Sequence, residues 1–220
     1  MAQMLRVIFA VIALICSFNQ ALTETPRDTV RIIFAMDQSH SMFDNNKIHN
    51  EASGEGLLVF LSNFQVTTCA EVTVDYFGWG SRTTEPIPVA LKAQQSGGQF
   101  AALVSDINQQ DLNSTLPSLA LITAKERLEQ SRADEQLIIF VTDGMPNNSM
   151  DEKIVLSGLI PEEVHLAAIT FGTDTVETYV QEKILRPGDL GFHVKSASDF
   201  ENALTHILKS LPILNTPCTG

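Results

Sequence analysis

Apolar residues in this chain gather in short runs and in stretches with helical spacing, separated by polar loops. Two runs are rich in branched and aromatic residues, Val30–Met36 and Leu137–Thr142, and each is followed at once by an aspartate, Asp37 and Asp143. Such runs are typical of strands buried on both faces, which occur in parallel sheets covered by helices. In open sheets of that class, ligands bind outside the carboxyl ends of the strands, where strand order reverses. The two aspartates are therefore expected at the functional edge of the sheet.

The rest of the pattern alternates between strands and helices. Further strands are expected over 71–79, 85–91, 163–171 and 191–195. The strand over 85–91 is expected at an edge, because Pro86 and Pro88 cannot donate to a central ladder. Helical spacing predicts helices over 50–64, 99–107, 116–130, 151–159, 175–185 and 197–211. This order favours an α/β three-layer, doubly wound fold with a mostly parallel six-stranded sheet and one antiparallel edge strand.

Three details of this pattern concern packing. Gly54 and Gly56 disfavour the first turn of the helix over 50–64. Ser198 is expected to cap the last helix, with Glu201 three residues later as its capping-box partner. Trp79 stands at a strand end, where a core or edge-packing role is favoured over that of an exposed anchor for a partner.

Composition narrows the class of partner. The chain has 220 residues, 44% of them apolar, and a formal net charge of −12. This length suits one domain of ordinary size with a full core. Nucleic-acid binding requires basic patches, and no run of Lys or Arg occurs. Nucleic acid and anionic membrane surfaces are therefore disfavoured as partners.

Residues 1–21 have the pattern of a secretory signal peptide. Arg6 precedes an apolar stretch over 7–18, and cleavage is expected after Ala21. The alternative is an uncleaved membrane anchor, for which the stretch is short, since a span needs about 20 residues. The mature product is therefore expected to be periplasmic or secreted, with no membrane span, and to consist of a domain over 28–212 and a tail over 213–220.

Removal of the signal leaves two cysteines, Cys69 and Cys218. An even number in an exported protein favours a disulfide, which would join the tail to the body of the domain. Two free thiols are the alternative. Neither cysteine has the paired spacing of a zinc site.

The loops at the two strand ends carry the candidate chemistry. The first reads Asp37-Gln38-Ser39-His40-Ser41, which has the form Asp-x-Ser-x-Ser, and the second begins Asp143-Gly144. Carboxylates and alternate hydroxyls are hard oxygen donors, which are the ligands of divalent cations such as Mg²⁺. The first motif alone is weak, but its place after a buried strand and the second strand-end aspartate make the combination specific.

These residues resemble the metal-ion-dependent adhesion site (MIDAS) of von Willebrand factor type A domains, and the resemblance covers about residues 28–212. It implies that Ser39 and Ser41 coordinate Mg²⁺ directly, with Ca²⁺ or Mn²⁺ as substitutes, while Asp37 and Asp143 hold it largely through waters. It also implies an open coordination position, which an Asp or Glu side chain of a protein partner fills. The stretches 76–79 and 143–148 are similar to an uncharacterised group of exported bacterial proteins with this fold.

The sequence departs from the family at two positions. The third loop lacks the usual Gly-Thr-x-Thr element, so either Asn113 or Thr115 supplies the third-loop oxygen, with Thr115 favoured because it keeps the hydroxyl chemistry. His40 stands where a glycine is usual. It is expected on the rim of the site, together with Asn147 from the loop after Asp143.

Catalytic signatures are missing from the sequence. There is no Gly-x-Ser-x-Gly elbow and no phosphate-binding glycine loop. Ser39 and His40 are not expected to form a catalytic pair, because adjacent residues rarely point at each other and no obvious group orients the histidine. The other histidines stand singly and are expected to be structural or exposed: His49, His165, His193 and His206.

Three functions fit these observations. The first is a non-enzymatic binding module that captures an acidic group through a divalent cation. The second is a metal-dependent hydrolase of phosphate or related esters, which the missing nucleophile and general base disfavour. The third is a scaffold with a decayed, metal-free site that binds partners through its helix faces.

Overall fold

The computed structural model describes residues 28–43, 48–63, 70–91, 111–130 and 132–215. Several sequence expectations lie outside these residues: the signal peptide over 1–21, the helix over 99–107, and both cysteines, Cys69 and Cys218. Within the described part of the chain, no helix is long and apolar enough to cross a membrane.

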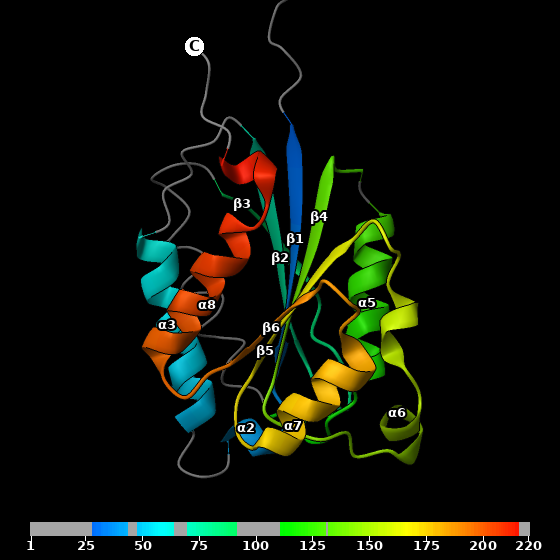
Figure 1. Cartoon of the computed structure of the whole chain (residues 1–220). Helices are drawn as coiled ribbons and strands as arrows, with labels where there is room; N and C mark the ends of the chain where they lie inside the picture. The colour runs from blue at the N-terminus through cyan, green and yellow to red at the C-terminus, as the bar shows by residue number, and fades with distance from the viewer. Residues whose placement is uncertain (1–27, 44–47, 64–69, 92–110, 131, 216–220) are drawn as a thin grey trace, which may run out of the picture.

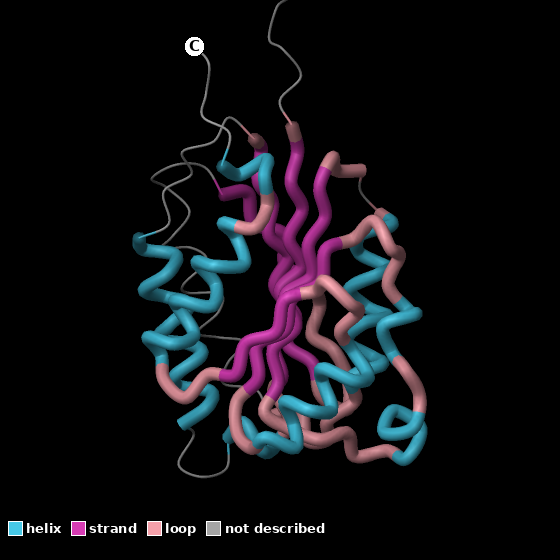
Figure 2. The backbone as a smooth tube through the Cα atoms, viewed as in Figure 1, coloured by secondary structure: helices cyan, strands magenta, loops and turns pink. Residues whose placement is uncertain are grey.

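A twisted sheet forms the centre of the molecule, with helices on both of its faces (Figures 1 and 2). The strand order is β3-β2-β1-β4-β5-β6. All neighbouring strands pair in parallel except β2 and β3, which pair antiparallel. The strands are β1 (Thr29–Asp37), β2 (Glu71–Trp79), β3 (Ile87–Leu91), β4 (Glu135–Thr142), β5 (His165–Thr170) and β6 (Leu190–His193). The predicted α/β architecture around a parallel sheet is confirmed.

Alternate residues of one apolar run enter two separate cores. On β1, Ile32, Phe34 and Met36 belong to the core beneath α3 (Ile48–Asn63) and α8 (Ala197–Lys209). Ile33 and Ala35 belong to the opposite core, beneath α5 (Pro117–Glu129). This double burial is why the run lacks polar alternation. Figure 1 shows α3 and α8 on one side of the sheet and α5 on the other.

The helix predicted over 151–159 is wrong as a continuous element. The chain instead forms α6 (Ser149–Lys153) and, after a break, the 3₁₀ turn η2 (Leu156–Leu159). Ile154 and Val155 are extended and exposed between them, and Leu156 is buried in the α5-side core. The break turns Leu156 inward, and β-branched residues such as these two are poor helix formers.

The other helices follow the predicted pattern with local differences. A short α2 (His40–Phe43) follows β1, and α7 (Asp174–Tyr179) runs into a π-helical turn, η3 (Val180–Ile184). The last helix, α8, is followed by the 3₁₀ turn η4 (Pro212–Asn215).

The predicted cap of α8 is also wrong. Ser196, not Ser198, is the N-cap residue, because its backbone is extended and its hydroxyl accepts the hydrogen bond from the Asp199 backbone N–H. The Ser196 hydroxyl in turn donates to the Asp199 carboxylate at 2.9 Å. The N-cap therefore lies two residues before the predicted one, and the carboxylate of Asp199 accepts from the Ser196 hydroxyl and from the Lys195 backbone N–H.

Gly56 lies inside α3 for a packing reason. A Cβ atom there would stand 2.6 Å from the carbonyl oxygen of Ala197 and 3.0 Å from the ring of Phe200, both in α8. The missing side chain lets the backbones of α3 and α8 approach closely. The glycine that weakened the helix prediction is therefore required by the tertiary contact.

Trp79 is fully buried, as its place in the sequence favoured, and its ring stacks on Phe140 with centroids 5.0 Å apart. It pairs with Asp37 across β1 and β2. Next to Asp37, Met36 pairs with Val141 of β4. Asp37 and the loop that begins at Asp143 therefore leave neighbouring strands at the same edge of the sheet.

Candidate metal centre

The predicted site lies where β1 and β4 end, because neighbouring parallel strands place their carboxyl ends together. Asp37 is the last residue of β1, and the chain then turns into α2, which carries Ser41. The Asp37 Oδ1 atom accepts a hydrogen bond of 2.7 Å from the Ser39 backbone N–H, which closes this turn. Three of the predicted ligands thus come from one strand end.

Asp37 is held entirely inside the protein. Its second oxygen, Oδ2, accepts a hydrogen bond of 2.6 Å from the hydroxyl of Thr142, the last residue of β4. Burial raises the pKa of Asp37 from 3.8 to about 7, and the nearby charge of Asp143 acts in the same direction. The hydrogen bonds from Thr142 and Ser39 oppose this shift. Asp37 is therefore a carboxylate whose negative charge lacks sufficient compensation from the protein itself.

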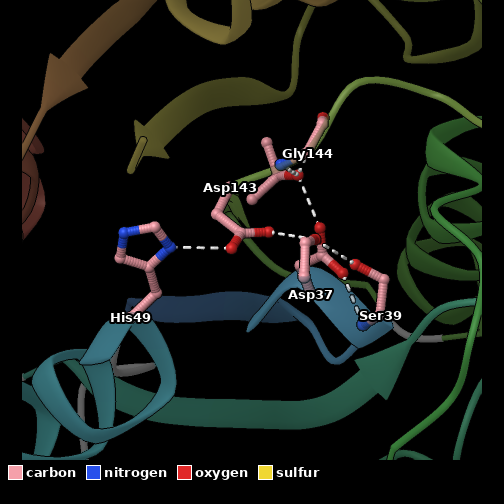
Figure 3. A network of polar contacts seen from close by, with 7 residues as sticks. Asp37, Ser39, His49, Asp143 and Gly144 are labelled. Atoms are coloured by element: carbon pink, nitrogen blue, oxygen red, sulfur yellow. Dashed lines mark hydrogen bonds and ion pairs between the residues drawn. The ribbon is translucent and has the colours of Figure 1, made fainter. Parts of the chain in front are cut away.

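A chain of polar contacts joins the two loops. The hydroxyl oxygens of Ser39 and Ser41 are 3.1 Å apart, and the Ser41 hydroxyl donates to Asp143 Oδ1 at 2.6 Å. Figure 3 shows Asp37, Ser39 and Asp143 converging on one small region. The structure thus brings together the four residues predicted from the two strand-end motifs.

His49, from the second position of α3, also contacts this region. Its Nδ1 atom lies 2.7 Å from Asp143 Oδ2, and its ring points at this carboxylate in Figure 3. Sequence reasoning missed this residue, because His49 stands singly and has no metal-ligand spacing to another histidine. Its position next to Asp143 depends on how α3 packs on the sheet, which no local pattern encodes.

The third loop lies beside the loop after β4. The Thr115 backbone N–H donates to Asn147 Oδ1 at 2.5 Å, and the Asn147 backbone N–H donates to the Thr115 carbonyl at 3.0 Å. A Cβ atom on Gly144 would stand 2.9 Å from Thr115 Oγ1 and 3.2 Å from Ser41 Oγ. Hydroxyls from two loops therefore lie close to Gly144, and a larger residue there would displace them.

Asn113 occupies a different position in the third loop. It is exposed and has a left-handed backbone with φ of 62°. Its carbonyl accepts a hydrogen bond of 2.6 Å from the His40 backbone N–H. Its main contact with the first loop is thus made by the backbone, and Asn tolerates this conformation better than most residues.

The rim of the site carries an oriented histidine. His40 Nδ1 lies 2.7 Å from Asp111 Oδ2, and this hydrogen bond lowers the pKa of Asp111. The expectation that no group orients His40 is therefore wrong, because the fold brings in Asp111 from a distant loop. An open cavity of about 660 Å³ lies over the site, lined by residues that include His40, Ser41, Asn113, Thr115 and Asn147.

The donor set suits a hard divalent cation. Hydroxyls of Ser39, Ser41 and Thr115 lie near two carboxylates, and such oxygens match Mg²⁺, Ca²⁺ and Mn²⁺. Among the described residues, no group of three or more His, Cys, Asp or Glu side chains is placed to hold a metal ion. Any cation held at this edge would therefore depend on the hydroxyls.

Comparisons with known proteins agree with the fold. Residues 32–210 match the family model of the von Willebrand factor type A domain. A search of curated protein sequences gives no significant match.

Solved structures show the same architecture at low identity. Proximal thread matrix protein 1 from the mussel byssus is 19% identical, with a TM-score of 0.62 over 84% of this chain and 46% of that chain. Another structure of that mussel protein is described as having a zinc-occupied MIDAS motif. This chain spans less than half the length of the mussel protein. BatB from Bacteroides thetaiotaomicron is 12% identical, with a TM-score of 0.59 over 82% of this chain and 99% of that chain.

A third solved structure is the manganese-loaded TRAP protein of Plasmodium vivax. It is 21% identical to this chain, with a TM-score of 0.54 over 80% of this chain and 72% of that chain. At these identities the likeness of the solved structures establishes the fold.

Proposed function

Because this chain belongs to the von Willebrand factor type A domain family, we propose that it is a binding module that captures an acidic group of a protein partner through a divalent cation. The observation that carries the proposal is the Ser41 hydroxyl, which contacts both Ser39 and Asp143 and so joins the two strand-end loops. A metal site built from both loops would account for the Asp-x-Ser-x-Ser motif after β1 and for the Asp-Gly motif after β4.

The hydrogen bonds of the site support a division of roles. Both oxygens of Asp37 accept hydrogen bonds from the protein, and both oxygens of Asp143 contact other side chains. The hydroxyls of Ser39 and Ser41 are the more adaptable donors, since a hydroxyl rotates to suit its partners. We assign direct coordination to the serines, and support through hydrogen bonds and waters to Asp37 and Asp143.

This division has a chemical consequence for the partner. Neutral hydroxyls leave a cation poorly neutralised, and when bound it acts as a Lewis acid toward an incoming carboxylate. The rim residues His40 and Asn147 then border the incoming group, since both line the open cavity over the site. A protein partner presenting Asp or Glu fits this arrangement.

Thr115 is the third-loop ligand in this proposal. Its hydroxyl lies near Gly144 together with that of Ser41, whereas Asn113 is exposed and contacts the first loop through its carbonyl. Mg²⁺ is the proposed cation, with Ca²⁺ or Mn²⁺ as substitutes. The zinc-occupied MIDAS motif of the mussel protein supports a divalent metal at this place in the fold, and the manganese-loaded Plasmodium protein supports a divalent metal in this fold.

Titration calorimetry with Mn²⁺ tests the site. We expect Ser41→Ala to weaken Mn²⁺ binding by at least about tenfold, because it removes a ligand. Thr115→Val, which keeps the shape and removes the hydroxyl, should act in the same direction. Ser198→Ala, on an exposed face of α8, is the matched control and should bind like the wild type.

A further control separates the two third-loop candidates. Asn113→Gly removes the side chain and keeps the left-handed backbone, so we expect it to retain Mn²⁺ affinity. If Asn113→Gly loses Mn²⁺ binding and Thr115→Val retains it, Asn113 is the third-loop ligand in place of Thr115. Equal binding by the wild type and Ser41→Ala would refute the site itself.

The partner is tested by capture from host envelope extract. We expect a protein to be retained with Mg²⁺ or Mn²⁺ and released by EDTA. Retention that survives EDTA, and that Ser41→Ala leaves unchanged, would support the scaffold function instead.

The proposal also includes export of the protein, with cleavage of a signal peptide after Ala21, and a disulfide between Cys69 and Cys218. The apolar stretch after Arg6 supports the signal peptide, and the even number of cysteines that remain after cleavage supports the disulfide.

A further inference from the structure

His49 lies between the candidate site and the core under α3 and α8. Its Nδ1 atom contacts Asp143 Oδ2 at 2.7 Å, and its ring stacks on Phe171 with centroids 5.4 Å apart and planes 26° apart. Phe171 in turn stacks on Phe200 of α8. The ring plane of His49 is thus fixed by core packing on one side, while its nitrogen points at a buried carboxylate.

The direction of the His49 hydrogen bond does not depend on the charge of the ring. An ionised carboxylate has no hydrogen to donate, so the hydrogen between these atoms is on Nδ1 in both the neutral and the charged imidazole. A neutral His49 is thereby held in the Nδ1–H tautomer.

The loop after β5 closes around this pair. Gly172 follows Phe171 and has a left-handed backbone with φ of 88°. A Cβ atom there would stand 3.2 Å from the Asp143 carbonyl oxygen and 3.9 Å from the His49 ring. The backbone just after β5 therefore passes close to the backbone of Asp143 and to the ring of His49.

We propose that His49 is a positioning residue of the cation site, which fixes the Asp143 carboxylate so that Oδ1 alone faces the hydroxyl of Ser41. This inference rests on the proposed function. With Oδ2 engaged by His49, the carboxylate does not turn to present both oxygens to the cation. The cation then keeps more of its positive charge for the acidic group of the partner.

The positioning role agrees with a general property of metal sites. Groups that hydrogen-bond to a metal-binding side chain orient it and tune its basicity, and their removal typically costs about 10- to 100-fold in metal affinity. In this chain the group is the imidazole of His49, which belongs to helix α3 and not to any of the three loops of the site. The site therefore depends on the docking of α3 as well as on its own loops.

The first arm of the test uses the metal-free protein in EDTA. Nitrogen-15 NMR of the imidazoles should show His49 as the Nδ1–H form, with a slowly exchanging hydrogen on that atom. Asp143→Ala should abolish the slow exchange. A His49 resonance typical of the Nε2–H form in the wild type would overturn the proposed contact without reference to any metal.

The second arm measures Mn²⁺ affinity by calorimetry. His49→Phe keeps the ring stacked on Phe171 and loses the donor, so we expect binding about tenfold weaker. His49→Asn carries an amide N–H near the former position of Nδ1 and should restore most of the affinity. His165→Phe, at the opposite end of β5 and exposed, controls for loss of a histidine and should bind like the wild type.

The outcomes distinguish the two proposals. If the wild type binds Mn²⁺ and His49→Phe binds it equally well, the role of His49 fails while the site stands. If His49→Asn is as weak as His49→Phe, the effect comes from packing and the positioning role is refuted. If the wild type binds no Mn²⁺ at all, the proposed function fails, and the role of His49 fails with it.

Discussion

At the scale of single residues, Asp37 is a carboxyl group buried beside a second carboxyl group. Its hydrogen bonds to Ser39 and Thr142 do not offset the cost of burial, so its pKa rises to about 7. A residue with this property destabilises the metal-free fold at neutral pH. The proposed cation site would give this residue a function that outweighs its cost in stability.

The raised pKa of Asp37 predicts a pH dependence of stability in EDTA. The folded protein keeps a proton on Asp37 between about pH 4 and 7, where the unfolded chain has lost it. The free energy of unfolding should therefore fall as the pH rises through this window. Each pKa unit corresponds to about 1.4 kcal/mol, which gives a contribution of at most about 4 kcal/mol.

Urea denaturation of the wild type and Asp37→Asn at pH 5 and pH 8 measures this contribution. Asp37→Asn removes the ionisable group, so its free energy of unfolding should change less with pH than that of the wild type. The difference should be at most about 4 kcal/mol. Mn²⁺ should reduce the sensitivity of the wild type, because a bound cation favours the ionised carboxylate. Identical pH profiles of the two proteins would contradict the burial of an ionisable Asp37.

At the scale of secondary-structure elements, α8 shows how a helix end is fixed. Ser196 and Asp199 exchange hydrogen bonds at its first turn, and Phe200, Leu204 and Ile207 pack into the core. The apolar residues determine that a helix forms and which face it buries. The capping pair determines at which residue it begins.

The cap is tested by a pair of serine variants in the same helix. Ser196→Ala should cost about 1 kcal/mol of unfolding free energy, because the Asp199 backbone N–H loses its acceptor. For a protein of this size, that loss lowers the melting temperature by about 2–4 °C. Ser198→Ala, in the first turn and exposed, should cause no loss and a slight gain from the higher helix propensity of Ala. If Ser198→Ala instead melts at a lower temperature than Ser196→Ala, Ser198 is the cap.

At the scale of the whole molecule, a buried charge ties three elements together. Asp75 on β2 is fully buried and pairs with Arg31 of β1. The Nε atom of Arg127, from α5, lies 3.3 Å from the same carboxylate oxygen, Oδ2. Asp75 therefore connects the centre of the sheet to the helix that covers it.

Asp75→Asn should destabilise the protein by about 3 kcal/mol, because it leaves two partly buried guanidinium groups without their counter-charge. The matched control is Glu129→Gln, which breaks an exposed ion pair with Lys125 on the same helix, α5. That change should cost less than about 1 kcal/mol. Urea denaturation compares the two variants, and equal small losses would show that Asp75 contributes little to the packing of α5.

The sequence by itself determined the alternation of strands and helices. Apolar runs such as Val30–Met36 need burial on both faces, and a sheet covered by helices on both sides provides it. The sequence also identified the two strand-end motifs, because neighbouring parallel strands end at one edge. Local periodicity and turn chemistry act within a few residues, so they can be read along the chain. The same rules located the first residue of α8 but not its cap, and they did not locate the break after α6, which depends on where Leu156 reaches the core.

Only the tertiary structure decided which distant groups meet. It placed His49 beside Asp143, Asp111 beside His40 and Thr115 beside Gly144, although each pair is separated by many residues. These contacts follow from the packing of α3 on the sheet and from the path of the third loop. The residue type fixes which atoms of a side chain can donate or accept hydrogen bonds, but the tertiary structure determines which partner they meet. The sequence therefore specified the oxygen atoms of the candidate site, and the packing of the helices specified what orients them.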